Sequence, residues 1–166
     1  MYKTYYASPI GRILILTDAN ALLGLWLEGQ KYFGAGYDLE QAQQEETKVS
    51  QHVVAWLDAY FKGENPAINE IPLAPQVTEF RSKVLTVLQK IPYGQTATYS
   101  DILRELQAEY GKIGSARAVG GAIGHNPISL LIPCHRIVGR DGKLTGYAGG
   151  LDKKFFLLKL ESGEKT

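Results

Sequence analysis

The chain has 166 residues, of which 45% are hydrophobic and 21% charged, with a formal net charge of +1. This length suits one domain, or a small domain joined to a second, with a working hydrophobic core. No apolar run approaches the ~20 residues of a membrane-spanning helix, and the N-terminus lacks the shape of a signal peptide, so we expect neither a membrane protein nor a secreted one. The single cysteine, Cys134, excludes an internal disulfide and favours a reducing compartment, which we expect to be the cytoplasm.

The charge is unevenly distributed along the sequence. Residues 1–76 contain five Lys/Arg and nine Asp/Glu, whereas residues 77–166 contain thirteen and eight. The first part therefore carries −4 and the second +5. An acidic part beside a basic one would suit a partner with a phosphate backbone, although an excess of this size also arises by chance.

The first part predicts a small sheet and one helix. Residues 32–46 are polar and rich in Gly and Gln, and we expect a loop there. Apolar residues recur at helical spacing over residues 49–61, and the three prolines of residues 63–76 indicate an extended linker. Three short segments rich in Tyr, Ile and Leu, separated by turn residues, predict a β-meander: residues 2–6, 12–17 and 21–27.

The second part predicts mainly helices. Thr98 and Asp101 fit a capping box, Ser115 can cap the next helix, and helix, turn and small-residue helix is the pattern of a helix-turn-helix. Residues 138–145 predict a hairpin. Four segments predict helices: residues 80–90, 99–110, 116–124 and 151 to about 160. The apolar residues that mark the last of these are Leu151, Phe155, Phe156, Leu158 and Leu160.

The predicted helix at residues 116–124 has an unusual composition. Gly120 and Gly121 each cost it roughly 1 kcal/mol relative to Ala, which a helix retains where something approaches its backbone closely. That neighbour is either a DNA strand or another helix. Arg117 lies in the first turn, where its charge opposes the helix dipole, so it is either a residue with a role outside the helix or an ordinary solvated side chain.

Residues 128–136 contain the only cysteine. The apolar run 130–132 leads to Pro133 and predicts a short buried strand. If the chain turns after Pro133, the thiol of Cys134 and the imidazole of His135 can serve one site. A thiolate is the reactive form, a free thiol titrates near pH ~8.5, and we expect His135 and Arg136 to favour the thiolate. The alternative is a buried, inert cysteine.

The tetrad Pro-Cys-His-Arg at residues 133–136 resembles the active site of the O6-alkylguanine-DNA alkyltransferases. Three further blocks stand at the family's spacing around it: Ala-Arg-Ala-Val-Gly-Gly at 116–121, Asn-Pro at 126–127 and Gly-Tyr-Ala-Gly-Gly-Leu at 146–151. The resemblance covers the C-terminal 90 or so residues closely and the first 75 loosely. Residues 107–114 look several residues longer than in the family.

The resemblance implies a two-domain fold. Residues 1–76 would form an α/β domain of the ribonuclease H-like kind, with a linker, that acts as a support. Residues 77–166 would form a mostly α, winged helix-turn-helix-like domain that binds DNA and carries the active site. Some family members hold a structural zinc through cysteines and histidines of the first domain. This chain lacks those cysteines and shows no metal-ligand spacing, so we expect no metal and no cofactor.

The resemblance also implies a reaction, the single-turnover transfer of an alkyl group from O6 of guanine to Cys134; whether O4 of thymine also serves is left open. Glu161 would orient His135, which draws the thiol proton through a water, and the hydroxyl of Tyr99 would assist the leaving base. The resemblance further implies that the protein is a monomer and binds double-stranded DNA through the minor groove. The family's remaining roles concern contacts with this DNA and with the base that is flipped out of it. They fall to Arg117 as a finger in the base stack, Gly120 on the recognition helix, Asn126 at the hinge, Tyr147 as the aromatic wall, the backbone N–H of Ala148 as donor to O6, and the carbonyls of Cys134 and Ile137 as acceptors.

The sequence is also compatible with two other functions. A cysteine hydrolase could use Cys134 and His135, but it would need an oxyanion hole, for which the sequence gives no separate signal. A non-catalytic helix-turn-helix protein could sense DNA damage, but family members of that kind lack the cysteine that this chain keeps.

Overall fold

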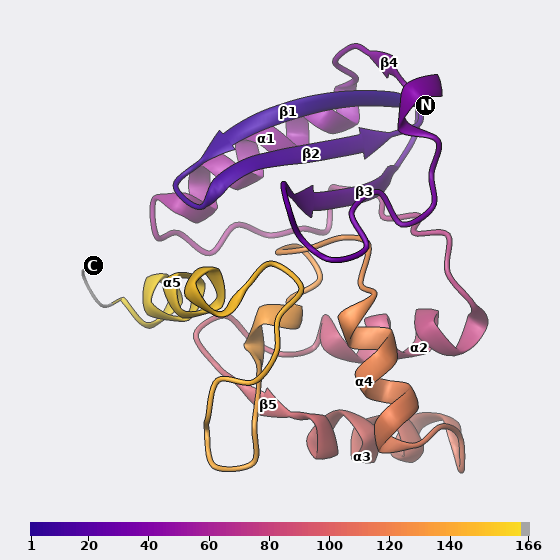
Figure 1. The fold of residues 1–166 in the computed structure, drawn as a ribbon, viewed down its shortest axis with the longest axis vertical. Coiled ribbons are helices and arrows are strands. Elements are labelled where there is room, and N and C mark those ends of the chain that lie inside the picture. Colours follow the sequence, from indigo (N-terminus) through magenta and orange to yellow (C-terminus); the bar gives the residue numbers. More distant parts are fainter. Residues whose placement is uncertain (164–166) are drawn as a thin grey trace. The chain divides into compact units, whose positions relative to one another are not determined.

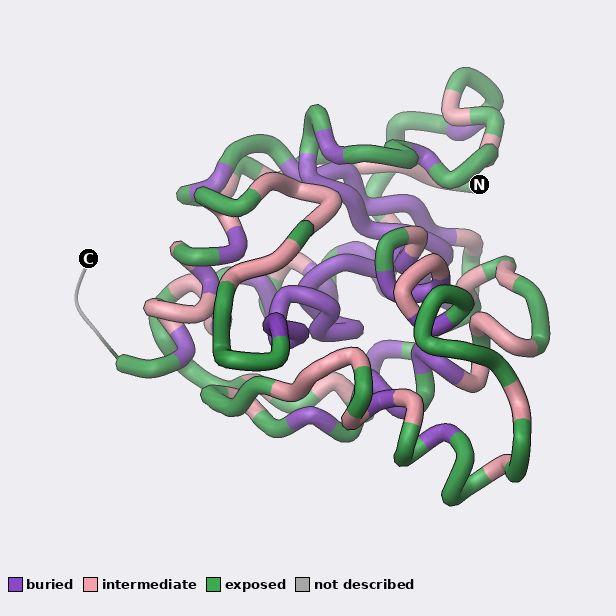
Figure 2. Tube along the Cα trace, turned by 60° about the horizontal axis from the view of Figure 1, so that its bottom comes forward, coloured by how far each residue is buried: buried purple, intermediate pink, exposed green. Residues whose placement is uncertain are grey.

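The computed structural model describes residues 1–163, which form two compact units (Figure 1). Unit 1 comprises residues 1–76 together with 127–129, and unit 2 comprises residues 77–126 and the chain from residue 130 onward. No helix in the described part of the chain is both long and apolar enough to cross a membrane. Figure 2 shows how burial varies along the trace.

Unit 1 is a four-stranded sheet with one long helix packed against it (Figure 1). The strand order is β3-β2-β1-β4, in which the first three strands form the predicted antiparallel meander and β4 pairs parallel with β1. The helix contacts β1 and β2 and carries the predicted apolar stripe. The elements are β1 (Tyr2–Ser8), β2 (Gly11–Thr17), β3 (Leu22–Leu27), a 3-10 turn η1 (Leu39–Gln41), β4 (Gln43–Gln44) and α1 (Lys48–Phe61).

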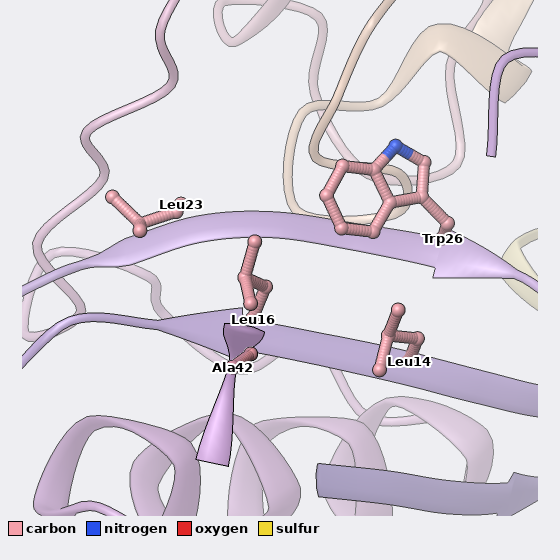
Figure 3. Close-up of a cluster of buried hydrophobic side chains, with 5 residues drawn as sticks. All are labelled: Leu14, Leu16, Leu23, Trp26 and Ala42. Carbon is pink, nitrogen blue, oxygen red and sulfur yellow. The ribbon is translucent and has the colours of Figure 1, made fainter. Parts of the chain in front are cut away.

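The expected loop at residues 32–46 is only partly a loop. It contains η1 and β4, because Gln43 and Gln44 pair with the edge of β1, a long-range contact that local composition does not reveal. Tyr37 and Leu39 from the same segment pack against a buried cluster on the sheet. Figure 3 shows that cluster, which consists of Leu14, Leu16, Leu23, Trp26 and Ala42.

Both faces of the sheet are covered. Consecutive residues of β2, from Ile13 to Thr17, are all buried, although neighbouring side chains on a strand point to opposite faces. Gly24 on β3 leaves room for the ring of Trp26, because a Cβ at Gly24 would lie 2.0 Å from that ring. The glycine is therefore a packing requirement of this face.

Residues 127–129 belong to unit 1 although they lie between two segments of unit 2. Leu25 donates its N–H to the carbonyl of Pro127 at 2.8 Å and accepts the N–H of Ser129 at 2.9 Å, so this short segment extends the sheet beside β3. The linker after α1 is also tied to unit 1, since the Trp56 indole donates to the carbonyl of Pro66 at 3.1 Å.

Unit 2 is a helical domain with a two-stranded parallel ladder. The helices α2, α3 and α4 contact one another, and α3 and α4 form the predicted helix-turn-helix (Figure 1). The capping box of Thr98 and Asp101 and the cap at Ser115 are confirmed. The elements are α2 (Glu79–Leu88), β5 (Ala97–Thr98), α3 (Tyr99–Tyr110), α4 (Ala116–Gly124), a 3-10 turn η2 (Cys134–Arg136), β6 (Ile137–Val138) and α5 (Leu151–Ser162).

Two predictions of strands in unit 2 are wrong. Residues 130–132 are buried but form a turn, in which Leu130 adopts a left-handed backbone with φ of 70°. Residues 138–145 do not form a hairpin: Gly139 donates to the carbonyl of Lys143 at 2.7 Å and closes a tight turn, while Val138 pairs with Thr98 of β5 instead. The run at residues 130–132 is buried as expected, but burial alone does not distinguish a turn from a strand.

The expected buried face of α5 is also wrong. Leu151 and Phe155 are 48% and 50% exposed, whereas the buried residues are Lys154, Leu157 and Glu161. These three positions recur at helical spacing, so the helix does have one buried face. That face carries two ionisable groups toward the interior of unit 2.

The packing of Gly24 gives a first prediction. Gly24→Ala should lower the free energy of unfolding by about 1–3 kcal/mol, because the added methyl overlaps the Trp26 ring. Urea denaturation followed by circular dichroism measures this loss. The double variant Gly24→Ala/Trp26→Leu should lose less than the sum of its single variants, and strict additivity would contradict the packing argument.

Candidate active site

The chain turns sharply at the cysteine. Pro133 has φ −82° and ψ 64°, and the following three residues form η2, closed by the N–H of Arg136 on the carbonyl of Pro133 at 3.0 Å. Because a 3-10 turn does not alternate its side chains as a strand does, Cys134 and His135 are both buried within unit 2. Of the two arrangements that the sequence left open, the turn is the one observed.

The carboxylate of Glu161 is the hub of the buried polar groups. One oxygen, Oε2, lies 2.5 Å from His135 Nε2 and 3.2 Å from Arg136 Nη2. The other, Oε1, accepts from Arg136 Nε at 2.7 Å and from the N–H of Gly94 at 3.2 Å. Donors from the 3-10 turn and from the turn after α2 therefore converge on the last turn of α5.

Each of the three guanidinium nitrogens of Arg136 donates a hydrogen bond in this arrangement. Besides the two bonds to Glu161, its Nη1 donates to the carbonyl of Ile91 at 2.7 Å, and its guanidinium lies 5.7 Å from the centroid of the Tyr93 ring. The expectation that Arg136 favours the thiolate directly is therefore corrected: the cation that acts on the Cys134 thiol is Lys154.

Burial determines the charge state of His135. Burial lowers the pKa of His135, while the bond to Glu161 opposes that shift, and the nearby charge of Arg136 lowers the pKa further. The imidazole is therefore neutral at neutral pH and donates Nε2–H to the carboxylate. Its Nδ1 then carries the lone pair, which is the form that a general base requires.

The thiol of Cys134 is buried and largely shielded from solvent. Burial raises the pKa of Cys134, and a hydrogen bond with the Asn126 side chain and the positive charge of Lys154 oppose that shift. Asn126 is itself buried at the end of α4 and donates Nδ2–H to the carbonyl of Ile132 at 2.9 Å. It thus braces the turn that leads into the cysteine.

The glycine-rich segment before α5 lies close to the thiol. Tyr147 is half-buried, and within residues 1–163 its buried hydroxyl has no hydrogen-bond partner. Burial raises the pKa of Tyr147 well above its usual value, and the neighbouring Cys134 and Glu161 raise it further. The turn continues through the half-buried Ala148 and is closed by the N–H of Gly150 on the carbonyl of Tyr147 at 3.0 Å.

Tyr99 and Ile137 are placed by the small ladder of unit 2. Ala97 pairs with Ile137 and Thr98 with Val138, so the ladder joins the start of α3 to the chain that follows the cysteine. Tyr99 comes directly after β5 and is half-buried, and Ile137 is fully buried. The backbone of both residues is therefore fixed near the 3-10 turn.

Arg117 and Gly120 lie on α4, away from the buried cluster. Arg117 is exposed in the first turn, at the opposite end of the helix from Asn126. A Cβ at Gly120 or Gly121 would meet nothing within 4 Å. Close packing of another helix in the described structure therefore does not explain these glycines, and the smooth surface of α4 is open.

Sequence reasoning named Glu161 of α5 as the partner of His135 but missed two other residues of this cluster. Arg136 is a partner of Glu161, and Lys154 is fully buried, yet neither role was foreseen. The signal was present, because Lys154 and Glu161 are seven residues apart and so lie on one face of a helix. Within residues 1–163, no group of three His, Cys, Asp or Glu side chains could hold a metal ion.

Comparison with known proteins finds the same family in both parts of the chain. Residues 1–75 match the profile of the 6-O-methylguanine DNA methyltransferase ribonuclease-like domain, and residues 79–163 match that of the DNA binding domain. The methylated-DNA–protein-cysteine methyltransferase of Haemophilus influenzae is 42% identical over 97% of this chain and 86% of that protein. That of Methanosarcina acetivorans is 41% identical over 97% and 98%.

A solved structure agrees with these relatives. The crystal structure of Mycobacterium tuberculosis OGT in complex with DNA superposes with a TM-score of 0.84 at 35% identity, covering 98% of this chain and 94% of that one. The chain belongs to the 6-O-methylguanine DNA methyltransferase family. The resemblance noted in the sequence and the two-part fold class that it implied are both confirmed.

The geometry of the hub gives a second prediction. Glu161→Gln should lower the free energy of unfolding by about 3–5 kcal/mol, because it leaves the buried guanidinium of Arg136 without its counter-charge. Thermal or urea unfolding measures the loss. Glu105→Gln on the exposed surface of α3 is the matched control, expected within about 0.5 kcal/mol of wild type. Equal effects of the two changes would contradict the role of Glu161.

Proposed function

We propose that this protein repairs DNA by moving an alkyl group, in the first place methyl, from O6 of guanine to the sulfur of Cys134. The observation that carries the proposal is the buried hydrogen bond between Glu161 and His135, the residue that directly follows the only cysteine of the chain. A carboxylate that orients a neutral imidazole beside a thiol is the arrangement that activates a nucleophile. Membership of the methyltransferase family supports the same reaction.

The proposed step balances as a displacement at carbon. The sulfur of Cys134 forms a bond to the alkyl carbon while the bond from that carbon to O6 of guanine breaks. The thiol proton passes to Nδ1 of His135, relayed by a water, and the resulting imidazolium is stabilised by Glu161. The departing guanine takes up negative charge, and the hydroxyl of Tyr99 donates a hydrogen bond or proton to it. The product is a thioether, which water does not cleave, so each molecule acts once.

The glycine-rich turn is the proposed pocket for the base. Tyr147 forms an aromatic wall beside the thiol, and the backbone N–H of Ala148 donates to O6. The carbonyls of Cys134 and Ile137 accept from the exocyclic amine. A turn of small residues suits this role because it lets the backbone approach a flat purine closely. The reaction then needs no metal and no cofactor.

Double-stranded DNA is the proposed partner of α4. The open surface at Gly120 lets a strand approach the helix in the minor groove, and the excess of positive charge in residues 77–166 favours phosphates. The target atom is buried in a duplex, so the base must be flipped at a cost of a few kcal/mol, and Arg117 fills the gap it leaves. We further propose that residues 1–76 support this domain and that the protein works as a monomer in the cytoplasm.

The third prediction tests the reaction itself. Incubation with a duplex that contains O6-methylguanine should add one methyl group to the peptide that carries Cys134, and a second portion of lesion should remain unrepaired. Intact-mass and peptide mass spectrometry measure both results. Cys134→Ala should bind the same duplex and transfer nothing. Repeated turnover of an ester would instead indicate a cysteine hydrolase, and unmodified protein on bound DNA would indicate a damage sensor.

The fourth prediction concerns Arg117. Arg117→Ala should slow repair of the duplex by about tenfold or more while repair of the free base stays within about twofold, because only the duplex requires a filled gap. Rapid-quench assays with both substrates measure the two rates. Arg12→Ala in unit 1 removes the same charge from another exposed position and should change neither rate. Equal slowing of both substrates by Arg117→Ala would rule out the finger role.

A further inference from the structure

Lys154 is the one fully buried cation on α5, within the described residues, that the proposed mechanism does not use. Its side chain is 0% exposed, and Nζ donates to the carbonyl of Thr145 at 3.1 Å and lies 3.5 Å from that of Gly146. A buried ammonium loses its hydration and is destabilising unless its surroundings compensate for that loss. Here it donates to backbone carbonyls rather than to a carboxylate, so a packing role alone does not account for the charge.

The partners of Lys154 belong to the segment that forms the base pocket. Thr145 and Gly146 come immediately before Tyr147 and Ala148, and the segment is closed at its other end by the bond between Gly150 and Tyr147. The lysine therefore fixes the start of the turn. Since it sits seven residues before Glu161, the same helix face holds both the pocket and the base His135.

The charges around the thiol leave Lys154 as the effective cation. Glu161 and Arg136 form an ion pair and largely offset each other, and His135 is neutral. The positive charge of Lys154 lowers the pKa of Cys134, and Cys134 in turn raises that of Lys154. The titratable and charged side chains that act on the thiol or on the groups beside it are His135, Arg136, Lys154, Glu161, Tyr93 and Tyr147.

We propose that Lys154 is a positioning residue for the transfer, with one ammonium group that anchors the pocket segment through Thr145 and Gly146 and supplies the counter-charge for the Cys134 thiolate. The two tasks are linked, because the hydrogen bonds to Thr145 and Gly146 that fix the segment also fix the position of the charge that acts on the thiol. In this proposal the lysine that stabilises the thiolate also holds the base pocket in its binding conformation. This inference rests on the proposed function for its first task, the anchoring of the base pocket, and stands without it for the second.

Three variants separate the two tasks. Lys154→Gln keeps a donor for the carbonyls but removes the charge, Lys154→Arg keeps the charge, and Lys154→Met removes both. The neighbouring Lys153→Met is the control for loss of a lysine from the same helix. Circular dichroism and thermal unfolding identify any variant that fails to fold, and Lys154→Gln and Lys154→Arg keep the comparison available if Lys154→Met does not fold.

The first readout is independent of DNA. Iodoacetamide alkylates the thiolate, and because Cys134 is the only cysteine, mass spectrometry across a pH series gives its apparent pKa directly. Lys154→Gln and Lys154→Met should move that pKa upward by about one unit or more, with about tenfold slower alkylation at neutral pH. Lys154→Arg and Lys153→Met should stay close to wild type. A pKa unchanged in the folded Lys154→Gln protein would overturn the counter-charge role.

The second readout is single-turnover transfer from an O6-methylguanine duplex. In Lys154→Met the transfer rate should fall by a larger factor than the rate of iodoacetamide alkylation, because the pocket segment is no longer anchored. In Lys154→Gln the difference between the two factors should be smaller, because a donor for the carbonyls remains. Equal losses in both assays for every variant would overturn the anchoring role. If wild type transfers nothing while the iodoacetamide pKa still shifts, the proposed function fails and the charge role of Lys154 stands.

Discussion

The site depends on a single buried carboxylate. Glu161 accepts hydrogen bonds from His135, Arg136 and the backbone of Gly94, and so joins the last turn of α5, the 3-10 turn at Cys134 and the turn that follows α2. These segments are far apart in sequence, and two of the three are turns rather than long helices or strands. Without the carboxylate, the imidazole would lack both its orientation and the tautomer that leaves Nδ1 as a base, and the guanidinium would be buried without a counter-charge.

The arrangement explains why α5 breaks the usual pattern of an amphipathic helix. It exposes Leu151 and Phe155 and buries Lys154 and Glu161, which is unfavourable for folding unless the buried charges are used. Stability is therefore exchanged for a preorganised site. The strained backbone of Leu130, just before the reactive turn, is a second cost of roughly 1–2 kcal/mol in the same region.

The sequence predicted those features that depend on local chemistry. The meander, the helices and the caps at Thr98 and Ser115 follow from periodicity and hydrogen bonding within a few residues, and the reactive tetrad was recognised as a block. Features that depend on distant partners were missed: the strand β4, the ladder between β5 and β6, and the inward face of α5. The run at residues 130–132 was correctly expected to be buried, but its turn, with the left-handed backbone of Leu130, was missed because a pattern of apolar residues indicates burial and not backbone geometry.

The protonation state of His135 tests this account most directly. Nitrogen NMR of the imidazole rings over a pH series, with the His135 signals assigned by their loss in His135→Asn, reports both charge and tautomer. The account predicts a predominantly neutral ring with its proton on Nε2 at pH ~6.5, where an ordinary histidine is half protonated. A ring that is cationic at neutral pH, or neutral with its proton on Nδ1, would contradict the role of Glu161 and the base assigned to the transfer.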